Sequence, residues 1–316
     1  MIVTDPRVAA DIIARGSLCA IPTETVYGLG GDAHNTDAVA QVFAAKGRPT
    51  DHPLIVHVAS LDEAMLWIRE LPAWAIKLAK SCWPGPLTLV GERTERATDN
   101  ITGGQNTVAV RIPAHPLTHD VLLDLAARGI HGVVAPSANR FGHVSPTTAL
   151  HVAADLGDYL DSHGGAILDG GDCEVGVEST IVLATGSQPL ILRPGGITRK
   201  AITEITGLMF ANGGADSPRV SGALDSHYSP NASVRLITLS EVAGITTGGL
   251  IAFHEIPTPP GVTRLAAPTT IEEFANELYG SLRKGDELHL ATIYVVSPTD
   301  EGLAEAIRDR LGRAAY

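Results

Sequence analysis

Cysteine and long apolar runs are scarce in this sequence, and each scarcity excludes a class of protein. The 316 residues include three cysteines, Cys19, Cys82 and Cys173, which are far apart and form no C-x-x-C pair. This spacing argues against a disulfide framework and against a zinc site, and we expect three buried thiols. No uncharged apolar run approaches the roughly 18 residues that a membrane helix needs, and the first residues lack the pattern of a signal peptide. We therefore predict a cytoplasmic protein with no membrane partner.

Positively charged residues are also fewer than negatively charged ones. The chain has 23 lysines and arginines against 35 aspartates and glutamates, for a net charge of −12. The counts are 15 against 22 in residues 1–206 and 8 against 13 in residues 207–316. Neither part resembles a basic nucleic-acid arm, so no direct tight binding of nucleic acid is expected. With 44% hydrophobic residues, the chain can bury a large core, and its length suggests about two domains.

Short β-rich runs alternate with helical periodicity along the chain, which is typical of an α/β protein. Strands are expected at residues 18–21, 54–58, 107–111, 133–135, 234–237, 250–253 and 291–296. Towards the end of the chain, helices are expected at 270–283 and 300–313. Periodicity is lost between Asn212 and Val234, where Gly, Asp, Ser and Pro gather, and this composition predicts a linker.

Two short turns, about ninety residues apart, supply cations and hydrogen-bonding groups. Lys46 and Arg48 follow a helix that is expected to begin near Thr36 and to end before a glycine. Ser137 and Asn139 lie in a turn of small residues after a strand. Alone, each turn is as consistent with a solvated surface or with local capping. A Lys-x-Arg pair, however, places a point charge beside a planar fork, which suits a polyphosphate, so together the turns indicate an anion site without a Walker loop.

A third motif runs from Pro22 to Gly31, where a strand is expected to enter a polar and then glycine-rich turn. Thr23 and Thr25 alternate, so their side chains should share one face. The turn would expose hydroxyls and backbone N–H groups, although an ordinary corner that needs glycine for a positive φ explains the pattern equally well.

Two polar residues stand inside apolar strands. Arg111 follows V-A-V and needs an anionic partner, which could be a ligand carboxylate. His57 lies in the run L-I-V-H-V, where a histidine is either a satisfied core residue or points into a cleft. The sequence contains no Ser-His-Asp elbow, H-E-x-x-H helix or P-loop. From the residues alone, the chain is therefore a soluble α/β protein with an anion-binding cleft.

Taken in order, these segments resemble the threonylcarbamoyl-AMP synthase family, whose catalytic part is a YrdC-like domain. The matching motifs, between residues 18 and 197, are P-T-E-T-V-Y-G-L-G, K-G-R-P, P-L-I-V-H-V, W-P-G-P-L-T, V-A-V-R-I-P, A-P-S-A-N, S-P-T, V-E-S-T-I and L-R-P-G-G. The stretch from Ser217 to Pro230, with its S-H-Y-S-P end, resembles the linker of the longer family members. The remaining residues resemble their Rossmann-like accessory domain.

The resemblance implies an α/β fold in which a YrdC-like twisted mixed sheet flanked by helices precedes a smaller Rossmann-like domain. The implied boundaries are 1–206 for the catalytic domain, 207–231 for a linker that crosses the active site, and 232–316 for the accessory domain. The implied reaction is that of a nucleotidyltransferase, in which L-threonine, bicarbonate or CO2, and ATP give threonylcarbamoyl-AMP and pyrophosphate. ATP is a substrate, and Mg²⁺ is expected to arrive on ATP and not on protein side chains. The product would pass to a separate tRNA threonylcarbamoyl transferase for the threonylcarbamoyladenosine modification.

The family's functional positions also transfer onto this sequence one by one. The implied threonine-binding residues are Thr25, His57, Arg111, Ala135 and Ser179, with Arg111 as the candidate carboxylate clamp. The implied ATP-binding residues are Arg48, His52, Thr107, Ser137, Ser145, Arg193 and Tyr228. Lys46 and Asn139 complete the pairs around the phosphates, so the implied catalytic group is Lys46, Arg48, Ser137 and Asn139.

One residue departs from the family pattern, and three other functions fit parts of the sequence. Many members carry Asn where this chain has His52, which could add pH dependence near its reference pKa of about 6.5. An RNA-binding module of the same fold is disfavoured by the acidic charge. Carbamoyl transfer in hydrogenase maturation needs zinc-finger cysteine pairs, and dihydroxybutanone-phosphate synthase needs an acidic cluster of metal ligands; the sequence shows neither.

Overall fold

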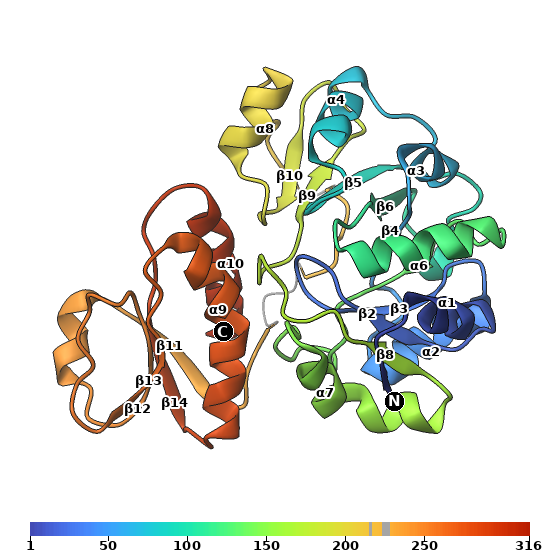
Figure 1. Ribbon diagram of the computed structural model, residues 1–316. Coiled ribbons are helices and arrows are strands. Elements are labelled where there is room, and N and C mark those ends of the chain that lie inside the picture. Colours follow the sequence, from blue (N-terminus) through green and yellow to red (C-terminus); the bar gives the residue numbers. More distant parts are fainter. Residues whose placement is uncertain (215–216, 223–227) are drawn as a thin grey trace.

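The computed structural model describes residues 1–214, 217–222 and 228–316, and these residues form two sheets of different size (Figure 1). In spatial order, the strands of the large sheet are β1 (Ile2–Val3), β8 (Ala166–Leu168), β2 (Cys19–Ile21), β3 (Gly28–Asp32), β7 (Val133–Val134), β4 (Ile55–His57), β6 (Thr107–Arg111), β5 (Leu87–Glu92), β9 (Thr180–Leu183) and β10 (Leu190–Arg193). Those of the small sheet are β11 (Ser233–Ile237), β14 (Thr292–Val296), β12 (Gly248–Ile251) and β13 (Val262–Ala266). We call the two regions the large-sheet part and the small-sheet part.

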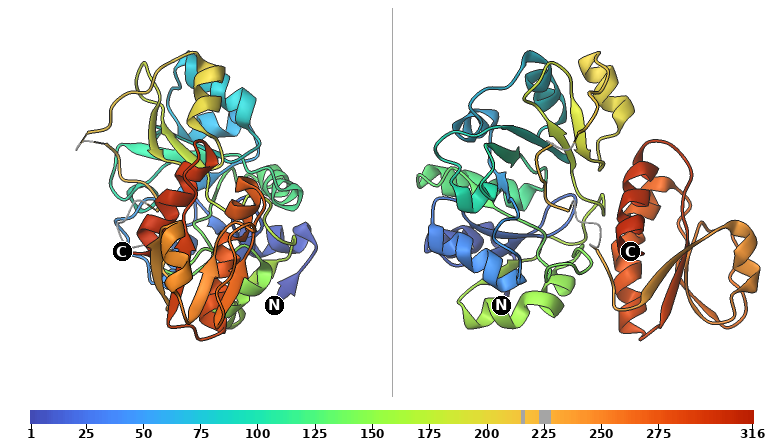
Figure 2. Two further views of the ribbon diagram at one scale, coloured as in Figure 1. Left: turned by 90° about the vertical axis from the view of Figure 1, so that its left-hand side faces the viewer. Right: turned by 180° about the vertical axis from the view of Figure 1, so that it is seen from behind.

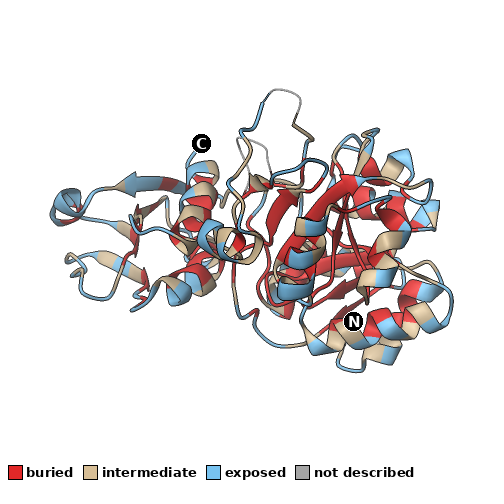
Figure 3. Cartoon of the chain, turned by 90° about the horizontal axis from the view of Figure 1, so that it is seen from above, coloured by how far each residue is buried: buried red, intermediate tan, exposed pale blue. Residues whose placement is uncertain are grey.

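The large sheet is mixed, as expected. Parallel pairs such as β4 with β6 stand beside antiparallel pairs such as β2 with β3. Its helices are α1 (Pro6–Ala14), α2 (Thr36–Lys46), α3 (Leu61–Trp67), α4 (Ala73–Cys82), α5 (Asp99–Thr102), α6 (Pro116–Ala127), α7 (Ala149–Ser162) and α8 (Arg199–Thr206). Because side chains alternate along a strand, Cys19 and Ile21 pack with α1 and α6, while Ala20 packs with the cluster that contains α2 and α7. The inner strands of the sheet are therefore buried between helical layers, whereas the edge strands β1 and β10 are partly exposed (Figure 3).

The small sheet is parallel throughout, which confirms a separate α/β layer at the end of the chain. Helices α9 (Ile271–Glu287) and α10 (Leu303–Ala314) cover one face, and the short 3₁₀ helix η1 (Leu239–Gly244) packs on the other. The views in Figure 2 place α9 and α10 on the side of the small sheet that faces the large-sheet part. The strand β13 was not expected from the sequence. The other three strands of the small sheet, β11, β12 and β14, differ from the expected ranges by a few residues at their ends.

Helix α2 forms as the sequence predicts. The Asn35 side chain caps its first turn by accepting hydrogen bonds from the backbone N–H groups of Asp37 and Ala38. Gly47 follows the helix with φ of 62°, a left-handed conformation that glycine adopts without strain. The cap therefore fixes where the chain leaves the helix between Lys46 and Arg48.

The glycine-rich turn expected at residues 28–31 is wrong. Gly28–Asp32 is strand β3, paired with β2 and β7, and none of its glycines has a positive φ. The glycines are instead needed for close packing: a Cβ on Gly30 would lie 2.8 Å from the carbonyl oxygen of Cys19, and one on Gly28 would lie 3.0 Å from Ala135 Cβ. A bend is found earlier, over residues 24–26.

The expectation of three buried thiols is wrong for one cysteine. Cys19 and Cys173 are buried, but Cys82 is partly exposed because it is the last residue of α4. In the part of the chain that the structure describes, no helix is long and apolar enough to cross a membrane. Ser226 and His227 of the S-H-Y-S-P stretch lie outside the described residues.

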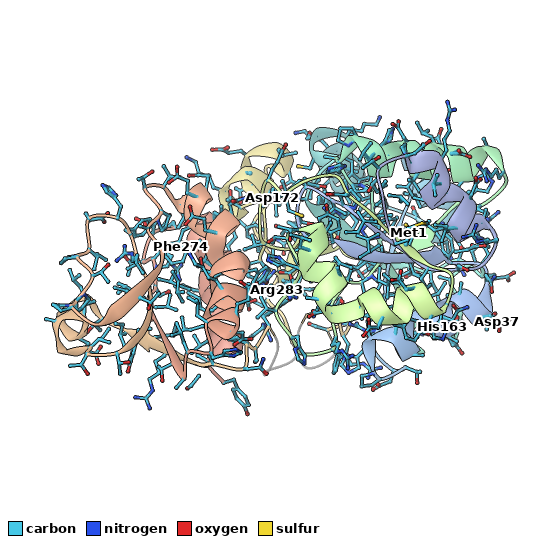
Figure 4. All side chains as sticks on the ribbon, turned by 60° about the horizontal axis from the view of Figure 1, so that its bottom comes forward. Met1, Asp37, His163, Asp172, Phe274 and Arg283 are labelled. Atoms are coloured by element: carbon cyan, nitrogen blue, oxygen red, sulfur yellow. The ribbon has the colours of Figure 1, made fainter. Side chains whose placement is uncertain are left out.

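Hydrogen bonds join the two parts. Arg283 on α9 contacts Asp155 on α7, with 2.8 Å between Nη2 and Oδ2, and Figure 4 shows Arg283 at the boundary. Asn276 on the same helix donates to the carbonyl oxygen of Cys173 at 2.6 Å. The small-sheet part is thus held against the large-sheet part by specific polar contacts.

Candidate active site

A small cavity brings together residues from the whole length of the large-sheet part. Its volume is about 40 Å³. It is lined by Thr25, Val26, Arg48, Ile55, His57, Arg111, Ala135, Pro136, Ser137, Glu178, Ser179, Arg193, Ser221, Gly222 and Tyr228. The strand order explains the convergence, since β7, β4 and β6 are neighbours in the sheet and β9 pairs with β10. Nine of the fourteen candidate residues line this cavity.

The remaining five candidates lie around the cavity and not on its wall. Lys46 and Asn139 stand behind Ser137, and Ser145 stands behind Glu178. His52 packs its ring edge-on against Phe141, 5.4 Å between centroids. Thr107 lines a neighbouring pocket that shares Ile55 and Ser221 with the cavity.

The two predicted cationic and small-residue turns meet in space. Lys46 Nζ donates to the carbonyl oxygens of Ser137 and Asn139 at 2.5 and 2.6 Å, so the lysine holds the small-residue turn in place. Burial, helped by the charge of Arg48, lowers the pKa of Lys46 well below its usual value. An ammonium group has three protons, and these two bonds leave one of them available.

Arg48 and Asn139 carry unsatisfied polar atoms. Arg48 Nη2 donates to the carbonyl oxygen of Pro53 at 2.9 Å and to Ser221 Oγ at 3.2 Å. Arg48 Nε and Asn139 Oδ1 are buried and have no hydrogen-bond partner among the described residues. Because buried polar atoms are nearly always paired in native proteins, these two atoms are available to bind a ligand.

At the other end of the cavity, the anionic partner of Arg111 is a protein side chain. Arg111 Nη2 donates to Glu24 Oε1 at 2.7 Å, and both side chains are almost fully buried. Glu24 Oε2 also accepts from the backbone N–H of Ala114 at 3.0 Å. Arg111 Nη1 makes no hydrogen bond to a described residue, so the ion pair leaves one edge of the guanidinium unused.

His57 and the two threonines lie near this ion pair. His57 pairs with Arg111 across β4 and β6, and burial together with the Arg111 charge lowers the pKa of His57 to about 3. The ring is therefore uncharged at neutral pH. The side chain is buried and also lines the cavity. The hydroxyls of Thr23 and Thr25 are 2.8 Å apart, which agrees with the expectation that they share a face, although Thr25 lies on a bend and not on a strand.

Ser179 and Arg193 complete the wall. Ser179 Oγ is 2.7 Å from Thr88 Oγ1, and Arg193 Nη2 donates to the carbonyl and hydroxyl oxygens of Ser179 at 2.9 and 3.1 Å. Arg193 Nη1 donates to the carbonyl oxygen of Ser221 at 2.8 Å. Ser221, Gly222 and Tyr228 belong to the segment that connects α8 to β11, which we call the connecting segment. These three residues line the cavity on the side of that segment.

Sequence reasoning missed two acidic residues, Glu24 and Glu178. Both stood in matching motifs, but neither was selected. The argument that an arginine in an apolar environment needs a partner applies equally to a glutamate, and each glutamate is indeed bound to an arginine, Glu24 to Arg111 and Glu178 to Arg310. That signal was available in the sequence, but the argument was applied to Arg111 alone.

His52 offers a pH-dependent prediction. Burial and the neighbouring Arg48 lower the pKa of His52 below 6.5, so protonation begins only in acid, below the value expected from the sequence. Protonation would add a cation near an anionic substrate, and a partly exposed charge of this kind contributes roughly 0.2–1 kcal/mol. If His52 contacts ATP, as the resemblance implies, we expect the KM for ATP to fall about two- to threefold as the pH drops through the lowered pKa of His52 in the wild type, and to stay level in His52→Asn. Parallel pH profiles would remove His52 from the ATP site.

Known proteins resemble this chain along its whole length. A family model described as telomere recombination matches residues 11–195, and one described as the C-terminal domain of threonylcarbamoyl-AMP synthase matches residues 197–316. The threonylcarbamoyl-AMP synthase of Pyrococcus abyssi is 38% identical, with 98% of this chain and 93% of the relative covered, and that of Bacillus subtilis is 36% identical over the same shares. A crystal structure of P. abyssi Sua5 complexed with L-threonine superposes with a TM-score of 0.88 at 35% identity and covers 100% of this chain and 97% of that one.

The fold and the matched relatives together define a nucleotidyltransferase built on a mixed α/β sheet. The chain belongs to the threonylcarbamoyl-AMP synthase family, in the form that carries both a YrdC-like domain and the C-terminal domain. Its activity is the synthesis of threonylcarbamoyl-AMP, and the AMP moiety of that product makes the enzyme an ATP-using synthase.

Proposed function

We propose that the cavity is the place where L-threonine, bicarbonate and ATP are assembled. The observation that carries the proposal is the convergence of three guanidinium groups, from Arg48, Arg111 and Arg193, with several hydroxyls on one buried cavity. The threonine amine must capture carbon dioxide as a carbamate, whose oxygen then attacks the α-phosphorus of ATP and displaces pyrophosphate. All reactants except CO2 carry negative charge, so the main work of the site is to hold mutually repelling groups against fixed cations.

Threonine occupies the end of the cavity formed by Thr25, His57, Arg111, Ala135 and Ser179. The free edge of Arg111 binds the substrate carboxylate, while Glu24 fixes the orientation of the guanidinium. The neutral imidazole of His57 and the hydroxyls of Thr25 and Ser179 offer hydrogen bonds, and the small Ala135 leaves room for the substrate side chain. In this arrangement, Glu24 positions the clamp and does not contact threonine.

ATP occupies the other end, near Arg48, His52, Thr107, Ser137, Ser145, Arg193 and Tyr228. Lys46 and Asn139 lie beside the phosphates, and the unsatisfied donor Arg48 Nε supports this placement. Fixed donors directed at the transferred phosphoryl group stabilise the charge that develops in the transition state, and this effect is usually the largest single contribution to catalysis.

Mg²⁺ is carried into the site by the phosphates of ATP. The two carboxylates close to the cavity fit this proposal because both are already engaged, Glu24 by Arg111 and the Ala114 N–H, and Glu178 by Ser145, Tyr279 and Arg310. When bound, the ion neutralises phosphate charge and helps pyrophosphate to leave. The residues that orient the reactants are those named above.

Ser221, Gly222 and Tyr228 must move away from the cavity before ATP can bind. Ligand pockets usually enclose roughly 300–1,000 Å³, whereas this cavity encloses about 40 Å³. Ser221 lines both the cavity and the Thr107 pocket, Gly222 lines the cavity, and Arg48 and Arg193 both bind Ser221. We therefore assign residues 1–206 to the catalytic domain, 207–231 to a linker that closes over the substrates, and 232–316 to the accessory domain.

The product is proposed to leave for a tRNA threonylcarbamoyl transferase in the cytoplasm. Threonylcarbamoyl-AMP is a mixed anhydride that water would hydrolyse, so a closing segment protects it until release. The net charge of −12 opposes direct tight binding of the enzyme to tRNA.

Substrate titrations test the assignment of the two ends. Loss of one hydrogen bond to a charged ligand weakens binding by about tenfold or more. We expect Thr25→Val to raise the dissociation constant of L-threonine by that factor and to leave ATP binding unchanged, and we expect Ser137→Ala to do the reverse. Calorimetry of both ligands against both variants measures this. If each variant weakened both ligands equally, the two ends would not be separate.

A further inference from the structure

A buried polar cluster connects the small-sheet part to the candidate active site. Its centre is Glu178, which lies between the cavity and helices α9 and α10. Glu178 Oε2 accepts hydrogen bonds from Arg310 Nε at 2.7 Å and from the Tyr279 hydroxyl at 2.8 Å, and Oε1 accepts from Ser145 Oγ at 2.7 Å. Tyr279 belongs to α9 and Arg310 to α10, so two residues from the far part of the chain hold one residue of the cavity wall.

The cluster is fully buried and well satisfied. The Arg310 side chain has 0% exposure, and its guanidinium also binds Asp309 and donates through Nη2 to the carbonyl oxygen of Pro194 at 2.9 Å. Although burial raises the pKa of Glu178, the charges of Arg310 and Arg193 outweigh that effect and lower it to about 2. Apolar side chains would hold two parts together at least as well as a buried ion pair. The polar groups therefore contribute geometry more than adhesion.

Each group that the cluster holds belongs to the nucleotide end of the site. Ser145 is bonded to Glu178 directly, and Pro194 follows Arg193. The Arg310 guanidinium lies over the Tyr228 ring at 5.3 Å, and the Tyr279 ring stacks on the Tyr228 ring at 5.6 Å between centroids. Because Tyr228 belongs to the connecting segment, Arg310 and Tyr279 form the surface against which that segment packs.

The cluster also fixes the polarity of the Ser145 hydroxyl. Glu178 is ionised and can only accept, so Ser145 must direct its proton towards Glu178. The oxygen then presents its remaining lone pairs, which accept from a donor. Among the parts of ATP, the ribose hydroxyls and the adenine amine are donors, whereas the phosphates are not. Ser145 is thus oriented for the nucleoside and not for the phosphates.

We propose that Arg310 and Tyr279 are positioning residues for ATP, which fix Glu178 and the Ser145 hydroxyl and provide the surface on which Tyr228 closes over the nucleotide. This inference rests on the proposed assignment of Ser145, Arg193 and Tyr228 to the ATP end. The small-sheet part would then contribute to the reaction indirectly, because its residues position the site without touching the substrate.

Steady-state kinetics of the full chain test the inference. The variants are Tyr279→Phe, Arg310→Met and Arg310→Lys, and the matched control is Glu305→Gln. Glu305 accepts from Arg199 at 2.9 Å across the same boundary, but this pair is partly exposed and contacts no residue of the cavity. We expect the KM for ATP to rise about tenfold or more in Arg310→Met and about three- to tenfold in Tyr279→Phe. The KM for threonine should stay within about twofold, Arg310→Lys should recover part of the loss, and Glu305→Gln should match the wild type.

Three outcomes would overturn the inference. The first is an unchanged KM for ATP in folded Tyr279→Phe, which decides the matter even if Arg310→Met does not fold. The second is a fall in kcat at constant KM for both substrates, because that pattern reports only a smaller active fraction. The third is an equal effect in Glu305→Gln, which would indicate a general requirement for contact between the parts.

A further variant separates this inference from the site assignment on which it depends. Ser145→Ala should raise the KM for ATP if Ser145 binds the nucleotide. If Ser145→Ala has that effect while Arg310 and Tyr279 variants do not, the positioning role is wrong and the assignment stands. If Ser145→Ala leaves the KM for ATP unchanged, the assignment itself is wrong, and the positioning role is rejected with it.

Discussion

Replacing Arg48 with methionine is expected to lower threonylcarbamoyl-AMP formation by about a thousandfold, since a single arginine in a phosphoryl-transfer site contributes roughly 10³–10⁵ to kcat. Methionine fills much of the same volume but carries no charge. It also cannot replace the hydrogen bonds that Arg48 makes, one to Pro53 and one to Ser221. The loss should appear mainly in kcat, because the fixed cation acts on charge that develops during the reaction. Pyrophosphate release measures it.

Lys46→Met is expected to lose activity to a similar extent but for an additional reason. Lys46 holds the turn of Ser137 and Asn139 by donating to their two carbonyl oxygens. Without the lysine, these buried oxygens have no partner, and each one left unpaired costs about 1–3 kcal/mol of stability. Lys200→Met is the control, because its side chain is 84% exposed on α8. Near wild-type turnover in Arg48→Met would contradict the assignment of the phosphate end.

Breaking the Glu24 and Arg111 ion pair is expected to have the largest effect on stability. Both side chains are almost fully buried, and removing one partner of such a pair leaves an uncompensated charge at a cost of about 3–5 kcal/mol. We expect Glu24→Leu and Arg111→Met each to lower the free energy of unfolding by about that amount. The double variant should be less destabilised than the sum of the two, because no charge is left behind. Denaturant unfolding of the four proteins measures the coupling.

The same variants test the clamp for the threonine carboxylate. Arg111→Met should weaken L-threonine binding by about tenfold to a hundredfold, as expected for a lost charged hydrogen bond. The double variant should bind threonine as poorly as Arg111→Met, although it is less destabilised than the sum of the two single variants. If it recovered threonine binding along with stability, Arg111 would have a structural role only.

Much of the fold was predictable because local signals agreed with the final packing. The strand ending at Arg111 and helix α2 with its left-handed Gly47 formed as expected, since the strand runs through the core and the helix carries its own start and stop signals. Strand β3 was missed because its glycines look like a turn in the sequence. Their reason is the close approach of Cys19 and Ala135, which belong to distant segments.

The residues of the site could be predicted from the sequence, but the contacts between them could not. Motif resemblance selected residues that the fold brings to one cavity, from Thr25 to Tyr228. It did not reveal that the anionic partner of Arg111 is Glu24, nor that Arg310 reaches Glu178 from the other part of the chain. Contacts between residues so far apart depend on how the two parts pack, and no periodicity or turn signal encodes that packing.

The measurement that tests the central claim most directly is pyrophosphate release from ATP with bicarbonate, Mg²⁺ and each amino acid in turn, combined with mass detection of the adenylate. We predict release that depends on L-threonine and a product with the mass of threonylcarbamoyl-AMP. Release that is independent of threonine, or no release with any amino acid, would contradict the account. In the second case, a salt-dependent gel shift with bare tRNA would show whether the cleft binds RNA instead.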